Sequence, residues 1–228
     1  MQRMKTGILG STAIAALALS AGAHSATLRF TESFGSEPAT GTAPWLEATF
    51  LQVDGDTVRL TVNALESLGE ADVTELYFNV GPGIDPSALV FDSVDPTTVD
   101  PTDTSNVGTF VPLAGANAYQ AGGDGRYDIW LNLPTADNEQ QRLSAGETLI
   151  FDITYSGGIT PDDFFYLSQP GPGGNPGPFL AAAHLQSTGP APYSGSDWVA
   201  AVPLPAAVWL LGSSLGMLGF ALRRRAAA

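Results

Sequence analysis

The small number of histidines and the lack of cysteine limit the chemistry that this 228-residue chain can perform. Catalysis by a serine or cysteine nucleophile requires a base beside the nucleophile. The sequence contains no cysteine and two histidines, His24 and His184. His184 stands beside Gln186 on the polar side of an expected strand, and no local motif supplies a serine and an orienting carboxylate. We therefore expect a structural or surface histidine, and no zinc site built from a single histidine without thiols.

The 23 acidic residues are the other candidates for catalysis. Glycoside hydrolysis uses two carboxyl groups about 5–10 Å apart, and any two of these residues could meet at that distance. Asp162 and Asp163 are adjacent at the start of an expected strand, so their side chains point to opposite faces and make a poor acid–base pair. A hydrolase stays an alternative without a supporting motif, and we predict that the chain is not an enzyme.

Aspartates in turns and loops suit calcium better than they suit catalysis, because calcium prefers oxygen ligands. The candidates are Asp54, Asp56, Asp124, Asp128, Asp92, Asp95, Asp100 and Asp103. None of them follows the ligand spacing of an EF-hand, and solvated turn aspartates are the commoner case. We therefore predict no cofactor and name no metal ligand, with calcium as the ion that these side chains would suit.

Trp130 is a candidate for stacking on a sugar ring. It lies on the polar face of an expected strand, where an exposed aromatic side chain can mark a binding surface. The alternative is that a loop or a second sheet covers it, and we favour burial. The glycine-rich run 171–174 contains proline and precedes no helix, so it is not expected to bind phosphate.

Hydrophobic residues recur with a period of two along most of the chain, which predicts β-strands. The clearest case is a hairpin, 45–53 and 57–65, joined at Asp54-Gly55, a dipeptide typical of type I′ turns. The other expected strands are 27–34, 74–80, 88–91, 109–113, 126–133, 148–155, 162–168 and 179–186. Loops are expected at 92–108 and 169–178, and one helical turn within 135–144. This pattern predicts an all-β, antiparallel, jelly-roll-like β-sandwich.

The first 25 residues have the organisation of a secretory signal peptide. Arg3 and Lys5 precede an apolar stretch, and Ala23-His24-Ser25 places small residues at the −3 and −1 positions for cleavage before Ala26. Cleavage after Ala23 or after Ala26 is the alternative. We therefore expect residues 1–25 to direct export across the inner membrane and to be removed.

The expected extracytoplasmic domain, residues 26–201, is strongly acidic. It holds all 23 acidic residues against four arginines and no lysine, so its formal charge is −19. Nucleic acid and anionic lipid bind through clustered cations, so we predict that neither is a partner of the domain. The domain has to be stable without disulfides, although an exported protein meets conditions that permit them.

The segment 202–228 combines three parts. Val202-Pro203-Leu204-Pro205-Ala206 leads into an uncharged, mostly apolar run, 206–222, which Arg223, Arg224 and Arg225 follow at once. As a helix this run spans about 26 Å, a little less than the hydrocarbon core of a bilayer. We expect a single transmembrane helix in the inner membrane, with the arginines on the cytoplasmic side.

This order of proline-containing signal, apolar helix and arginine cluster resembles the sorting tail of PEP-CTERM surface proteins, in the variant that reads Val-Pro-Leu-Pro-Ala. The resemblance implies that an exosortase, a membrane-embedded cysteine protease or transpeptidase, recognises Val202 to Ala206 and processes the tail. Arg223 to Arg225 and the apolar helix would halt the chain in the membrane until then. An ordinary single-pass membrane anchor is the alternative interpretation of this segment.

Shorter motifs in the body, Gly123–Asp128, Ala182–Gln186 and Ser194–Trp198, resemble domains that often precede this tail. Together the resemblances imply a Gram-negative cell-surface or extracellular-matrix protein, with a structural or adhesive role linked to exopolysaccharide or biofilm. The second hypothesis is a carbohydrate-binding module, with or without calcium, that associates with extracellular polysaccharide. A hydrolase is the third.

Overall fold

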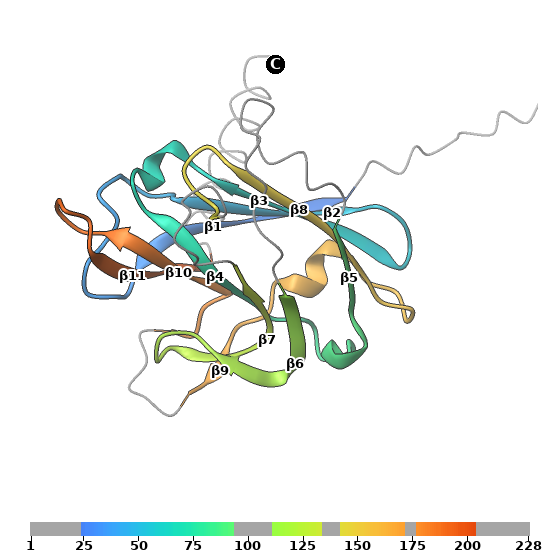
Figure 1. Cartoon of the computed structure of the whole chain (residues 1–228). Helices are drawn as coiled ribbons and strands as arrows, with labels where there is room; N and C mark the ends of the chain where they lie inside the picture. The colour runs from blue at the N-terminus through green and yellow to red at the C-terminus, as the bar shows by residue number, and fades with distance from the viewer. Residues whose placement is uncertain (1–23, 94–110, 134–141, 172–176, 204–228) are drawn as a thin grey trace, which may run out of the picture.

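A computed structural model describes residues 24–93, 111–133, 142–171 and 177–203. These residues form an all-β structure, in which eleven strands pair antiparallel and the helical elements are short 3₁₀ turns (Figure 1). The predicted all-β, antiparallel fold class is therefore confirmed.

The strands are β1 (Ser25–Ser33), β2 (Leu46–Gln52), β3 (Thr57–Ala64), β4 (Asp72–Phe78), β5 (Val90–Ser93), β6 (Val111–Gln120), β7 (Gly125–Asn132), β8 (Thr148–Thr154), β9 (Gln169–Pro170), β10 (Ala181–Thr188) and β11 (Gly195–Ala201). The 3₁₀ helices in the described residues are η1 (Glu66–Leu68), η2 (Pro86–Ala88) and η4 (Pro161–Phe164).

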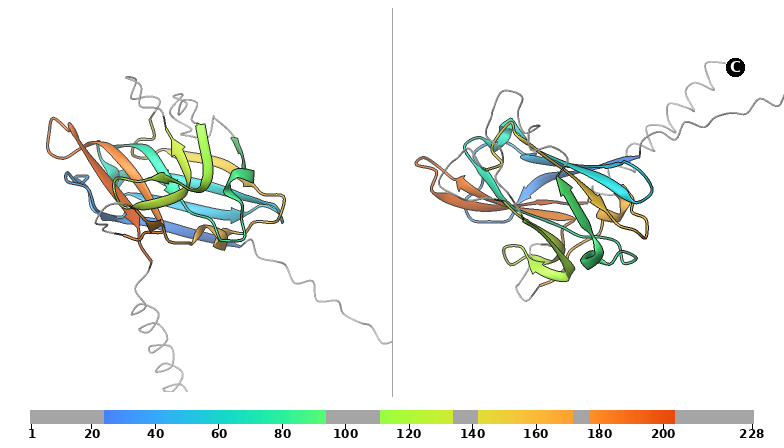
Figure 2. Two further views of the ribbon diagram at one scale, coloured as in Figure 1. Left: turned by 90° about the horizontal axis from the view of Figure 1, so that it is seen from below. Right: turned by 45° about the vertical axis from the view of Figure 1, so that its right-hand side comes forward.

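The strands are hydrogen-bonded in the order β5-β8-β3-β2-β1-β11-β10-β4-β7-β6, and the short β9 pairs with β7. The first half of this order, β5 to β1, and the second half, β11 to β6, form two layers that face each other (Figures 1 and 2). The result is a β-sandwich-like arrangement built from one continuous path of strands.

Contacts between aromatic rings show how far the sheet folds back on itself. In a flat sheet, β2 and β4 would lie four strand spacings apart, about 19 Å. Instead the ring centroids of Phe50 in β2 and Phe78 in β4 are 5.6 Å apart, with the rings at 90°. Phe164 of η4 stacks on Phe50 at 4.1 Å. The inner faces of both halves therefore share one hydrophobic core.

Strand β1 forms the corner between the two halves. Its residues Ser25 to Phe30 pair with β2, whereas Phe30 to Ser33 pair with β11. The register with β11 shifts between Phe30 and Glu32, which indicates a β-bulge. A strand that bends at a bulge and changes partners is a common way to turn the corner of a sandwich.

Burial follows the predicted alternation in the first half and departs from it in the second. In β3, Val58, Leu60, Val62 and Ala64 are buried, and the residues between them are half-buried. In β4 and β10, buried residues occur on both faces of the strand. Other parts of the chain therefore cover the outer face of the second half.

The predicted hairpin is confirmed as β2 and β3, but its turn differs from the prediction. Four residues, 53–56, separate the strands, and Gly55 does not adopt the positive φ of a type I′ turn. Instead the Asp54 carboxylate accepts a hydrogen bond from the Asp56 N–H at 2.9 Å, and the Val53 N–H donates to the Thr57 carbonyl at 3.0 Å. The aspartate side chain thus organises the turn in place of glycine.

The predicted strand at 162–168 is wrong. Its first residues form η4, because Thr160 and Asp163 make a capping box. The Asp163 carboxylate accepts hydrogen bonds from the Thr160 N–H and from the Thr160 hydroxyl, both at 2.8 Å. Asp162 is exposed, whereas Asp163 is half-buried and its carboxylate is engaged in the capping box.

Two strands are missing from the prediction. The sequence pattern does not predict β11. It predicts a loop at 169–178, but the first two residues of this segment form β9 and pair with β7. β6 is also longer than the predicted strand 109–113.

Several predictions concern parts of the chain outside the described residues. These are the signal peptide 1–25 apart from His24 and Ser25, most of the loop 92–108, most of the helical turn at 135–144, the transmembrane helix 206–222, and Arg223 to Arg225.

We expect Phe50→Ala to lower the free energy of unfolding by about 3–5 kcal/mol, the range for truncating a buried phenylalanine. The substitution removes the ring that contacts both Phe78 and Phe164. Urea unfolding of the purified protein measures the change.

Val53→Ala is the control, because this side chain is 47% exposed in the turn after β2. It should change the free energy of unfolding by no more than about 0.5 kcal/mol. Similar losses for the two variants would contradict the arrangement of Phe50 between the two halves.

Candidate functional site

The outer face of the second half carries a second cluster, which we call the aromatic cluster. Its members are the buried Tyr77, Ala121, Tyr127 and Ala182 and the half-buried Phe34, Tyr119, Trp130 and Trp198. Tyr77 stacks nearly parallel to Trp130 at 6.3 Å and also contacts Trp198 at 5.8 Å. The turn that precedes β7 covers part of this cluster.

Three motifs that are far apart in the sequence meet at the aromatic cluster. They are Gly123–Asp128, Ala182–Gln186 and Ser194–Trp198. Ala182 and Tyr127 belong to the cluster, and the imidazole of His184 stacks on the indole of Trp198 with 4.5 Å between ring centroids. We interpret these motifs as parts of one packing arrangement, because their shared feature is contact with each other.

Gly122 explains why the turn before β7 is rich in glycine. Its φ is +52°, and a Cβ atom at this position would lie 2.6–2.8 Å from the indole ring of Trp198. The neighbouring Gly123 also has a positive φ, +98°, but a Cβ atom there would contact nothing within 4 Å. Only glycine therefore combines the conformation of the turn with its close approach to the tryptophan.

Asp124 fastens another segment to this turn. The side chain is fully buried and accepts hydrogen bonds from the hydroxyls of Tyr127 and Ser168. Burial, reinforced by the neighbouring carboxylate, raises the pKa of the Tyr127 phenol, which stays protonated and can donate. Ser168 Oγ in turn accepts from the Phe179 N–H at 3.1 Å. Asp124 thus links β7 to the chain on both sides of β9.

Buried carboxylates in the described residues act mainly as hydrogen-bond acceptors within the fold. They are Asp72, Asp124, Asp128, Glu147 and Asp197. Asp72, for example, accepts from Arg142 at 2.9 Å and from the Ser144 hydroxyl at 2.8 Å. Asp197 accepts from the Ser33 hydroxyl at 2.8 Å. These contacts give each carboxylate a structural role.

The calcium candidates do not gather in the described residues. No group of three or more histidine, aspartate or glutamate residues is placed to hold a metal ion within that part of the chain. Asp54 and Asp128 instead bind backbone N–H groups, and Asp124 binds hydroxyls. Asp95, Asp100 and Asp103 lie outside the described residues.

His184 is half-buried on β10. Its Nδ1 lies 3.0 Å from the Thr74 hydroxyl and 3.6 Å from a Glu75 carboxylate oxygen. Burial lowers the pKa of His184, and the charges of Glu75 and Asp197 oppose this effect only in part. The contacts are those of a packed structural histidine, as the sequence predicts.

Trp130 is half-buried between Tyr77 and Tyr119, with ring centroids at 6.3 Å and 5.8 Å. Its indole N–H is shielded from solvent and has no hydrogen-bond partner among the described residues. The partial burial of the ring and the full burial of its N–H favour a packing role for Trp130.

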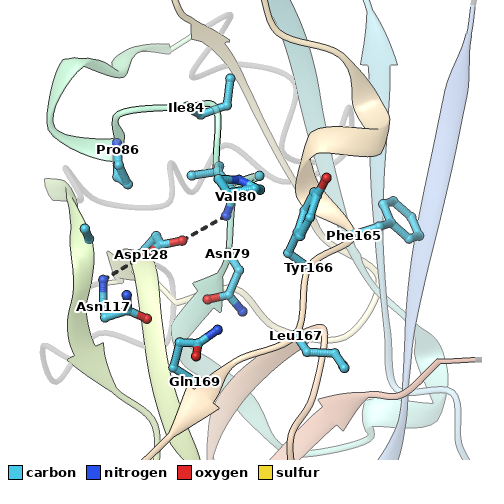
Figure 3. Close-up of a pocket in the computed structure, with 13 residues that line it drawn as sticks. Asn79, Val80, Ile84, Pro86, Asn117, Asp128, Phe165, Tyr166, Leu167 and Gln169 are labelled. Atoms are coloured by element: carbon cyan, nitrogen blue, oxygen red, sulfur yellow. Dashed lines mark hydrogen bonds between the residues drawn. The ribbon is translucent and has the colours of Figure 1, made fainter.

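A groove of about 620 Å³ opens at the end of β4 (Figure 3). Its lining comes from four places: six residues between Asn79 and Pro86 after β4, Ala116 and Asn117 of β6, Asp128 of β7, and four residues between Phe165 and Gln169 after η4. Of these residues, only Asp128 is a candidate from the sequence, as a calcium ligand. The groove combines segments distant in the sequence, so no local motif could indicate it.

Asp128 joins two walls of the groove. One oxygen of its carboxylate accepts from the Val80 N–H at 3.1 Å, and the other accepts from the Asn117 N–H at 2.8 Å (Figure 3). Asn117 has a positive φ, +49°, within the irregular part of β6 where the register with β7 shifts. On the opposite side, the Gly81 N–H donates to the Asp163 carbonyl at 2.8 Å. The groove is therefore framed by hydrogen bonds.

Of the predicted sorting residues, only Val202 and Pro203 are described. Val202 is half-buried directly after β11, and Pro203 is exposed. Leu204, Pro205, Ala206 and the three arginines lie outside the described residues. Within the described part of the chain, no helix has the length and apolar character needed to cross a membrane.

A scan against protein-family models and searches of curated proteins and of solved structures give no match to this chain. Its function is therefore inferred from its own residues.

We expect Gly122→Ala to destabilise the protein by about 1–3 kcal/mol, because the new methyl group collides with Trp198 and the positive φ disfavours alanine. Thermal unfolding followed by tryptophan fluorescence measures the loss. Gly55→Ala is the matched control, since a Cβ atom there meets nothing within 4 Å. An unchanged melting temperature for Gly122→Ala would refute the close contact.

The pKa of His184 predicts a pH dependence of stability. Because folding lowers this pKa below 6.5, the unfolded chain binds more protons as the pH falls through that value. The titration of His184 therefore does not lower the free energy of unfolding above about pH 6.5, and it lowers this free energy as the pH falls below that value. NMR titration of the imidazole should give a midpoint below 6.5, and His184→Gln should weaken the loss of stability between about pH 6.5 and pH 5. A midpoint at or above 6.5 would contradict the burial effect.

Proposed function

We propose that this chain is an exported surface or extracellular-matrix protein of the PEP-CTERM type, in the Val-Pro-Leu-Pro-Ala variant. Residues 1–25 direct export, and the helix 206–222 with Arg223 to Arg225 holds the chain in the inner membrane. An exosortase then processes the tail at the sorting signal, Val202 to Ala206. The released domain serves at the cell surface or in the matrix, in a structural or adhesive role linked to exopolysaccharide.

The observation that carries this proposal is the position at which β11 ends. Ala201 is the last residue of β11, and it pairs with Phe30 of β1 and with Ala181 of β10. Its carbonyl accepts a hydrogen bond from the Leu180 N–H at 2.9 Å. The signal begins at the next residue, and Pro203 is already exposed. Because Pro203 is exposed directly beyond a strand paired on both sides, we expect a processing enzyme to reach this point without unfolding of the domain.

The character of the domain supports a structural role. It is acidic and carries no lysine, which favours solubility outside the cell and disfavours nucleic acid as a partner. Its buried carboxylates hold hydroxyls, an arginine and backbone N–H groups in place. An all-β, sandwich-like fold of this kind, stabilised by two apolar clusters and without cysteine, suits a protein that persists in an extracellular matrix.

The test is a double variant of the signal, Pro203→Ala with Pro205→Ala, in a Gram-negative host that contains an exosortase. The wild-type chain should convert to a shorter form on immunoblots of the cell envelope, whereas the double variant should stay at full length. Because both prolines follow β11, the domain itself should fold normally in the variant.

Pro190→Ala is the control, since Pro190 is an exposed proline within the described domain, between β10 and β11. It should be processed like the wild type. Equal shortening of the double variant, or no shortening of the wild type, would reject processing at this signal.

A further inference from the structure

We infer that the groove at the end of β4 is a binding site for a neutral saccharide. This inference goes beyond export and processing of the tail, and it rests on residues that neither process uses. A volume of about 620 Å³ lies within the usual range for small-molecule sites, roughly 300–1,000 Å³.

The groove is held in shape before any ligand arrives. The Asp128 carboxylate ties the segment after β4 to the bulge of β6 through Val80 and Asn117. The backbone of Gly81 is hydrogen-bonded to Asp163, whose carboxylate closes the capping box of η4. A preformed site loses less conformational entropy when it binds.

Two large side chains line the groove and remain open to solvent. Tyr166 is 43% exposed and Leu167 is 41% exposed, in the segment between η4 and β9. The edge of the Tyr166 ring packs against Gly81, where a Cβ atom would lie 3.0 Å from the ring. Glycine at this position therefore lets the ring lie close to the wall, with part of its surface open to a ligand (Figure 3). Apolar ring surface of this kind can pack on the C–H face of a sugar.

The polar groups of the groove are mostly amides. Asn79 is only 3% exposed, yet its Nδ2 has no hydrogen-bond partner among the described residues. A buried donor without a partner is costly, so a ligand that accepts a hydrogen bond would gain affinity there. Gln169 is exposed and lines the same groove (Figure 3). Amides both donate and accept, which matches the hydroxyl groups of a saccharide.

The charge of the groove disfavours anionic ligands. The described residues that line it include no lysine, arginine or histidine, so a phosphate, sulfate or uronate group would find no cation. Its one carboxylate, that of Asp128, has each oxygen occupied by a backbone N–H. A ligand with hydroxyls and without net charge fits this lining best.

The test uses the full chain, extracted in detergent, and a panel of neutral oligosaccharides made of glucose, galactose or mannose. An anionic polyuronate and a neutral proline-rich peptide complete the panel. We expect binding to at least one neutral saccharide, measured by calorimetry, and none to the polyuronate or the peptide. Binding of the polyuronate or of the peptide in place of a neutral saccharide would overturn the inference, and so would the absence of any binding by the folded protein.

Variants locate the binding. Tyr166→Ala should weaken it about tenfold, equivalent to ~1.4 kcal/mol, whereas Tyr166→Phe keeps the ring and should bind nearly as well as the wild type. Tyr193→Ala is the matched control, because Tyr193 is 38% exposed and lines a different recess, with Glu70 and Asp72. Asn79→Asp replaces the buried donor and should also weaken binding.

Thermal unfolding shows whether each variant is folded, and the Tyr166 series decides the question if Asn79→Asp is unstable. Equal binding by wild type and Tyr166→Ala would place the saccharide elsewhere and refute the site. Because binding is measured on the unprocessed chain, a failure here is distinct from a failure of processing at the tail.

Discussion

The change of partner along β1 is the constraint on which the rest of the structure depends. Ser25 to Phe30 belong to one half of the sheet, and Phe30 to Ser33 pair with β11 of the other half. The bend lets Phe50 and Phe78 meet across the sandwich and gives both halves one core. It also sets β11 between β1 and β10, so the strand that precedes the tail is paired on both sides.

The outer face of the second half of the sheet is covered by other parts of the chain, and this cover explains the roles of Gly122, Asp124, His184 and Trp130. Gly122 lies against Trp198, and Asp124 ties the turn before β7 to Ser168. Two residues that the sequence offers as candidates for chemistry take part in packing in this layer. His184 stacks on Trp198, and the half-buried Trp130 contacts Tyr77 and Tyr119. The groove opens beside it, where β6 bulges at Asn117 and the chain leaves β4.

The sequence predicts the elements whose pattern is local. The alternation of Val58, Leu60 and Val62 is enough to place β3 and its hairpin. The local pattern does not predict a strand where tertiary contacts decide the structure. Asp197 is buried within β11 and its carboxylate accepts a hydrogen bond from Ser33, so the sequence of this strand is polar and resembles a turn. The capping box of Asp163 likewise overrides a strand-like run of aromatic residues. The groove could not be predicted, because it assembles four segments, whereas the proposed sorting signal is a linear motif that sequence alone can suggest.

The central claim is that a folded, exported domain ends at Ala201 and that the tail beyond it is removed. Mass spectrometry of the C-terminal peptide, from protein recovered from the envelope and from the medium of a host with an exosortase, tests this most directly. The account predicts a C-terminus within Val202 to Ala206 and the loss of Arg223 to Arg225. Mature protein that still ends at Ala228 in both fractions would contradict it and would identify the segment as an ordinary membrane anchor.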